Sequence, residues 1–94
     1  MKFDIGQCYA TPGALNAIER AGLSFAGLLG RHVRGDCGDL DASDKASNDD
    51  ALRDGSRIFS AYRLATGVRV WLITEAVDDD GMRGSTTLLL PSEY

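Results

Sequence analysis

The chain lacks the features that mark membrane and secreted proteins. No apolar run approaches the ~18–20 residues that a membrane-spanning helix needs. Residues 1–6 also lack the apolar core of a signal peptide. We therefore expect a cytoplasmic protein with no membrane partner.

Cysteine and histidine are scarce, and they form no metal-binding pattern. Cys8, Cys37 and His32 are the only residues of these types, whereas a zinc site uses paired ligands about two to four residues apart. The acidic turns do not have the ligand spacing of a calcium loop either. Both thiols are expected to be free, because a cytoplasmic setting keeps them reduced. We predict no metal and no cofactor.

Positive charge is in deficit and is not clustered. The 94 residues hold 10 Lys and Arg against 14 Asp and Glu, which gives a net charge of −4. Direct binding to nucleic acid needs several cations on one face. The composition therefore disfavours a nucleic-acid partner.

The chain has an excess of aspartate within one segment. Residues 36–54, here called the acidic segment, contain seven aspartates and no glutamate, opposed only by Lys45 and Arg53. The segment thus carries a charge of −5, so the rest of the chain is almost balanced. Such a segment repels nucleic acid and attracts basic protein surfaces. We predict that a protein partner with a basic surface binds its early part through Asp36, Asp39, Asp41 and Asp44.

Residue spacing predicts one α+β domain over residues 1–94, beginning with a strand. Apolar and polar residues alternate over residues 3–9, as they do in a half-buried strand. Thr11 and Pro12 then form a helix-start signal, and Gly22 is placed to end that helix.

One or two further short helices are expected, two to three in all. Ser24 caps the first of them, which carries an apolar stripe and ends at Gly35. Within the acidic segment a loop comes first, and a third helix follows it. Ser43 or Ser47 is the expected cap of this helix, and Gly55 closes it.

From residue 57 onward the spacing changes to the period of two that strands show. Residues 58–64, 68–77 and 85–90 are predicted to form three strands, and Pro91 ends the last one. The short connections imply an antiparallel β-meander. We expect the helices to pack on one face of this three-stranded meander.

His32 and Cys37 are the one pair of residues with catalytic potential. A cysteine and a histidine form a thiol nucleophile when a carboxylate or amide orients the histidine. Asp36 and Asp39 flank the sulfur, however, and negative neighbours suppress the thiolate form. We predict no catalytic residue. The alternative is a small enzyme or metal-dependent factor centred on His32, Asp36, Cys37 and Asp39.

The aromatic residues and three arginines leave more than one interpretation open. Large aromatic side chains are usually needed in the core of a small domain, so we expect core positions for Tyr9, Phe59, Tyr62 and Trp71. On a sheet face away from the helices they would instead form a surface for a partner. Three arginines on neighbouring strands line a solvated face or pair with the acidic segment of a second copy, which would give a homodimer: Arg57, Arg63 and Arg69.

Five segments together resemble a known group of proteins. They are residues 10–15, 31–40, 55–62, 70–76 and 86–94. Over nearly its whole length the chain is similar to small plasmid-related proteins carried on bacterial mobile elements, some of them labelled restriction-system subunits. It departs from that group at Cys37, where the pattern has a large residue such as tryptophan, and at residues 77–83, which look like an insertion in the last hairpin.

Charge and this resemblance together predict a non-enzymatic interaction protein. Mobile elements carry inhibitors of nucleic-acid-directed defence complexes, so the resemblance implies an anti-CRISPR or antirestriction role. The acidic loop at residues 36–44 would then occupy a basic nucleic-acid channel by mimicking phosphates. A structural subunit that dimerises through a sheet edge or an aromatic face is a further alternative.

Overall fold

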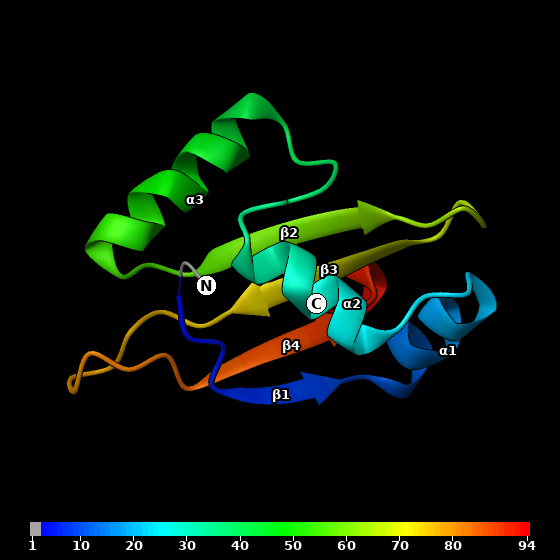
Figure 1. The fold of residues 1–94 in the computed structure, drawn as a ribbon, viewed down its shortest axis with the longest axis horizontal. Coiled ribbons are helices and arrows are strands. Elements are labelled where there is room, and N and C mark those ends of the chain that lie inside the picture. The colour runs from blue at the N-terminus through cyan, green and yellow to red at the C-terminus, as the bar shows by residue number, and fades with distance from the viewer. Residues whose placement is uncertain (1–2) are drawn as a thin grey trace.

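The computed structural model describes residues 3–94, which form one β-sheet and three α-helices (Figure 1). The elements follow in the order β1 (Gln7–Ala10), α1 (Pro12–Arg20), α2 (Phe25–Val33), α3 (Ala42–Asp54), β2 (Ile58–Arg63), β3 (Arg69–Thr74), β4 (Ser85–Leu89) and the 3-10 helix η1 (Pro91–Glu93). This is the predicted α+β class, with three helices where the sequence predicts two to three.

The sheet has the strand order β1-β4-β3-β2. β2, β3 and β4 form the predicted antiparallel meander, with Ser60 opposite Leu72 and Leu72 opposite Leu88. β1 adds a fourth strand parallel to β4, with Cys8 beside Thr86. Figure 1 shows α2 across one face of the sheet, α1 at the end of that face and α3 beside β2.

The core lies between the sheet and the two N-terminal helices. Alternate residues of β2, β3 and β4 face these helices, as the period of two predicts. The buried cluster consists of Ala14, Ile18, Leu28, Tyr62, Leu64, Val70, Leu72 and Leu88. Burying one large apolar side chain stabilises the fold by about 1.5–3 kcal/mol, so this cluster holds α1 and α2 on the sheet.

The first two helices begin where the sequence predicts. Thr11 caps α1 by accepting a hydrogen bond from Ala14 N at 3.1 Å, and Pro12 occupies the first turn. Ser24 caps α2 by accepting from Gly27 N at 3.0 Å. These caps depend only on local residues, which is why the sequence identifies them.

The predicted start of the third helix is wrong. The cap is Asp41, whose carboxylate accepts from Asp44 N at 2.8 Å, and neither Ser43 nor Ser47. Aspartate caps as well as serine does and also favours the positive end of the helix dipole. Gly55 ends the helix in the left-handed conformation, at φ +82°, as predicted.

The first strand is also shorter than the pattern predicts, because it includes only the end of residues 3–9. β1 begins at Gln7, after Gly6 turns the chain at φ +61°. The strand predicted at 68–77 ends at Thr74. Beyond it, Val77 N donates to Gly55 O at 2.8 Å, so the chain leaves β4 and packs against the end of α3.

No helix in the described part of the chain, residues 3–94, has the length and apolar character that a membrane span requires.

Candidate functional site

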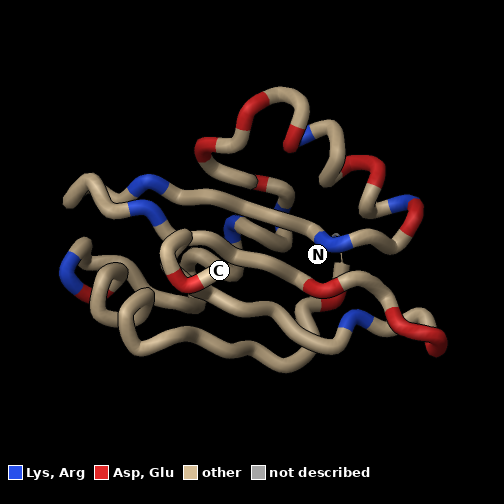
Figure 2. The backbone as a smooth tube through the Cα atoms, turned by 180° about the vertical axis from the view of Figure 1, so that it is seen from behind, with Lys and Arg blue, Asp and Glu red and all other residues tan. Residues whose placement is uncertain are grey.

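The acidic segment has two parts with different structures. Residues 36–41, here called the strap, run along the outer edge of β2. The remainder forms α3. Figure 2 shows both parts on the same side of the molecule, above the sheet in that view. The sequence predicted a loop followed by a helix, and the structure confirms that order.

The strap pairs with β2 in the manner of a short extra strand. Ala61 N donates to Cys37 O at 3.1 Å, and Asp39 N donates to Ala61 O at 2.7 Å. Gly38 lies between these bonds at φ +71°, where a Cβ would collide with Ala61 O. Only glycine fits so close to a carbonyl in this conformation. Gly38 therefore fixes where the strap meets the sheet.

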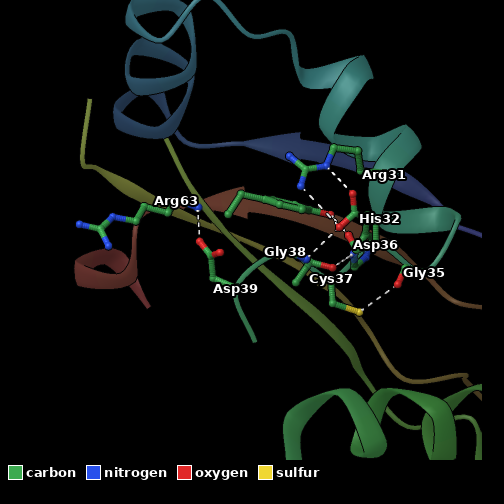
Figure 3. Close-up of polar contacts among 10 residues, drawn as sticks. Arg31, His32, Gly35, Asp36, Cys37, Gly38, Asp39 and Arg63 are labelled. Carbon is green, nitrogen blue, oxygen red and sulfur yellow. Dashed lines mark hydrogen bonds and ion pairs between the residues drawn. The ribbon is translucent and has the colours of Figure 1, made fainter. Parts of the chain in front are cut away.

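Asp36 is bound within the protein. Arg31 Nε donates to Asp36 Oδ2 at 2.7 Å, and Gly38 N donates to Oδ1 at 3.2 Å (Figure 3). The hydrogen bond from the Arg31 guanidinium holds the pKa of Asp36 below its usual value. Tyr62 OH donates to the Asp36 backbone O at 2.7 Å, so the strap is also anchored to the core.

Two more of the predicted partner-binding carboxylates have internal roles. Asp39 Oδ2 accepts from Arg63 N at 2.8 Å (Figure 3), and Asp41 caps α3. Within residues 3–94, the Asp44 side chain takes part in no hydrogen bond or ion pair. Of the four residues, Asp44 alone has a carboxylate that the fold does not use.

α3 is the more exposed part of the acidic segment. Of its 13 residues only Asn48 and Ala51 are buried. Its four aspartates are all exposed, and one of them, Asp50, forms an ion pair with Arg53. Ala46 and Leu52 are exposed as well.

Two side chains, those of Asn48 and Arg83, hold α3 in place. Asn48 Nδ2 donates to Phe59 O at 2.6 Å and Asn48 Oδ1 accepts from Phe59 N at 2.9 Å, so one amide binds both backbone groups of a β2 residue. Arg83 Nη2 donates to Ala51 O at 3.1 Å, and Arg83 Nη1 donates to Ser56 O at 2.7 Å. The sequence offered no local signal for these long-range bonds.

His32 belongs to a buried polar chain and is 1% exposed. Its Nδ1 lies 2.6 Å from Ser60 Oγ and its Nε2 lies 2.8 Å from Thr74 Oγ1. Thr74 Oγ1 lies 2.6 Å from Thr86 Oγ1, which donates to Ile5 O at 2.7 Å. Each hydroxyl has one proton, so the last bond fixes the direction of the bonds between Thr86 and His32 Nε2.

Thr86 accepts from Thr74, so Thr74 accepts from His32 Nε2–H. Burial lowers the pKa of His32 to about 4, so the ring is neutral at pH 7. In the neutral ring Nδ1 carries no proton and accepts from Ser60. Ser60 and His32 resemble a nucleophile and its base, yet Ser60 is 0% exposed and cannot meet a substrate. This buried row of hydrogen bonds therefore has the geometry of a structural element and not of a catalytic site.

Cys37 does not share a hydrogen bond with His32 in the described part of the protein. Its Sγ donates to Gly35 O at 3.5 Å and accepts from Asn48 Nδ2 at 3.1 Å. Cys8 and Cys37 are both free thiols. Among residues 3–94 no group of three or more His, Cys, Asp or Glu is arranged to hold a metal ion.

The sheet face away from α1 and α2 carries aromatic residues. Tyr62 is buried in the core, as predicted, whereas Phe59 and Trp71 are only partly buried. The core prediction is wrong for Tyr9, which is 56% exposed. β2 and β3 place Phe59 and Trp71 on the opposite side from Tyr62, because successive side chains of a strand alternate. Tyr94 packs against Trp71 on this face.

Three arginines are exposed on that same face: Arg63 in β2, Arg69 in β3 and Arg57, which directly precedes β2. Arg63 and Arg69 lie opposite each other at one end of the sheet. Arg57 lies toward the other end, where its Nη2 donates to Tyr94 OH at 2.9 Å. The predicted solvated face is therefore present.

Comparison with known proteins finds no relative of this chain. Neither the protein-family models, nor the curated proteins, nor the solved structures contain a match to this chain. The resemblance to plasmid-related proteins thus stays a prediction.

Proposed function

We propose that this chain is a non-enzymatic interaction protein whose acidic segment binds a basic protein surface. The partner that suits it best is a nucleic-acid-directed defence complex, which the protein inhibits in the manner of an anti-CRISPR or antirestriction factor. Its setting is the cytoplasm of a bacterium that carries the corresponding plasmid-related element. The resemblance in sequence supports this setting.

The observation that carries the proposal is the placement of α3. A helix with only two buried residues contributes little to the core, yet its own Asn48 and the distant Arg83 hold it on the sheet. It presents four exposed aspartates against Lys45 and Arg53. A fixed row of carboxylates pairs with a basic surface without the entropic cost of ordering a loop.

The structure supports different roles for the strap and α3 within the acidic segment. The carboxylates of the strap bind the protein's own backbone and Arg31, so they shape the surface. Asp44 and Asp49 have no such bonds within residues 3–94. We infer that the partner contacts these two residues first, and that the strap contributes charge at longer range.

A competition experiment tests the proposal. The purified protein is titrated into restriction and CRISPR effector complexes bound to labelled nucleic acid, and release of the nucleic acid is measured at 50 and about 300 mM salt. We expect release that weakens as salt rises, because exposed charge pairs are screened. Failure to bind or displace nucleic acid from every such complex at low salt would contradict the proposal.

One observation favours the dimerising subunit as a second candidate. The outer edge of β2 is closed by the strap and Asn48, whereas β1 is an edge strand. Gln7 N and Thr11 N bond toward β4, so the backbone groups of Cys8 and Ala10 point outward from the sheet. Edges of this kind pair with other chains. A concentration-independent monomer by light scattering would exclude this candidate.

A further inference from the structure

A groove lies between α3 and the sheet face that carries the aromatic residues. Its volume is about 340 Å³, and it is lined mainly by Asp44, Arg57, Phe59, Trp71, Ile73 and Tyr94. This volume is near the lower end of the range in which proteins bind small ligands or single side chains. No residue of the strap lines this groove.

Three aromatic rings form the apolar part of the groove. The ring centroids of Phe59 and Trp71 are 5.1 Å apart with an interplanar angle of 88°, and those of Trp71 and Tyr94 are 5.6 Å apart at 70°. Each ring therefore stands on edge to its neighbour. Aromatic faces carry negative charge density, so a groove lined by three rings suits a cation.

The charges around the groove also favour a cation. Arg57 is already engaged, because it donates to Tyr94 OH and its Cζ lies 5.7 Å from the centre of that ring. Asp44 has no hydrogen-bond or ion-pair partner for its carboxylate among residues 3–94. Asp44 and Arg57 balance each other formally within the lining. α3 adds three further aspartates against Lys45 and Arg53, so the surroundings of the groove are negative.

We propose that this groove receives an arginine side chain from the basic partner. The guanidinium pairs with Asp44, and its planar face and aliphatic stem pack on the ring of Trp71. The chain itself shows this chemistry at the same place, where Arg57 lies over Tyr94. This inference rests on the proposed function, since it names the group by which a basic partner is recognised.

The fluorescence of Trp71 reports directly on binding at the groove, because Trp71 is the only tryptophan of the chain. The protein is titrated with acetyl-arginine amide, and its intrinsic fluorescence is recorded at constant ionic strength. Acetyl-citrulline amide, which has the same shape without the charge, is the matched ligand. We expect a saturable change with arginine and an affinity for citrulline that is lower by roughly tenfold.

Two variants locate the site. Asp44→Asn should weaken arginine binding by roughly three- to tenfold. Asp49→Asn removes the same charge from α3 outside the groove lining, and it should change the affinity by less than about twofold. Both positions are exposed, so neither change threatens folding. Circular dichroism and thermal unfolding verify that both variants fold.

Equal affinity for arginine and citrulline would overturn the inference, and so would equal effects of the two variants. The outcome is separable from that of the proposed function. If the protein displaces nucleic acid but arginine produces no change at Trp71, the groove is not the contact and the function stands. If arginine binds at the groove but no defence complex is affected, the function fails and the site remains.

Discussion

The strap and α3 are both rich in aspartate, yet the fold binds all three carboxylates of the strap and leaves two of those in α3 unbound among residues 3–94. Asp36, Asp39 and Asp41 each accept a hydrogen bond from a backbone N–H, and these bonds close the edge of β2 and start a helix. Asp44 and Asp49 of α3 face solvent. A run of like residues thus does not define one function, because backbone groups without partners bind the nearest side-chain oxygen first.

The largest effect is expected from the glycine that brings the strap to the sheet. Gly38→Ala places a Cβ against Ala61 O and forces a non-glycine residue to φ +71°. We expect a loss of at least about 3 kcal/mol in the free energy of unfolding, measured with urea. Gly67→Ala is the control, since it has φ +90° with no atom within 4 Å of the added Cβ. It should cost only about 1 kcal/mol. Equal losses would show that the strap does not need this close approach.

The next effect concerns the amide that holds α3. Asn48→Ala removes both partners of the Phe59 backbone groups, so we expect a loss of about 2–3 kcal/mol in unfolding free energy. Hydrogen exchange at the Phe59 amide should become much faster. Asn16→Ala makes the same change at an exposed position of α1 and should be nearly neutral. If Phe59 stays protected in Asn48→Ala, α3 is held by other contacts.

Acid should weaken the fold through His32. Its pKa is about 4 in the native protein against 6.5 as the ordinary value, so the unfolded chain binds more protons between these pH values. Stability is therefore complete above pH 6.5 and falls as the pH decreases toward 4. From pH 7 to pH 5 we expect a loss of about 2 kcal/mol in the free energy of unfolding.

His32 is the only histidine, so NMR resolves its contribution. The Cε1 proton of the native protein should not titrate between pH 7 and pH 5. A midpoint near 6.5 with stability unchanged over this interval would show that the ring is hydrated and is not part of the buried chain.

The smallest effects distinguish the strap from α3 by stability alone. Asp41→Ala removes the cap of α3 and should cost about 1 kcal/mol. Asp49→Ala changes the same charge on the exposed helix and should alter the free energy of unfolding by less than about 0.5 kcal/mol. Chemical denaturation at pH 7 measures both. Equal costs would remove the distinction between structural and free carboxylates.

Helix ends and the faces of the strands could be predicted from the sequence, because they depend on residues close together in the chain. Thr11, Ser24 and Gly55 start or end helices through residues within one turn, and the alternation in β2 and β3 assigns their two faces. The bonds of Asn48 to Phe59 and of Arg83 to Ser56 and Ala51 could not be predicted, because they join residues 11, 27 and 32 positions apart. Only the folded chain shows which β2 groups lack a partner.

The candidate site was predicted in location but not in detail. The acidic segment was correctly identified as a loop and a helix, and its exposure follows from its composition. The sequence could not separate Asp39 from Asp44, since that depends on the approach of the strap to Arg63 N. The groove over Trp71 could not be predicted from the sequence either, because it joins residues of α3, two strands and the C-terminal segment.

The most direct test compares two double variants in the competition experiment. Asp44→Asn with Asp49→Asn removes two charges from α3, and Asp79→Asn with Asp80→Asn removes two from the exposed turn after β3. We predict that the α3 pair weakens displacement of nucleic acid by roughly tenfold while the turn pair changes it by less than about twofold. Equal inhibition by the two variants would contradict the assignment of α3 as the interaction surface.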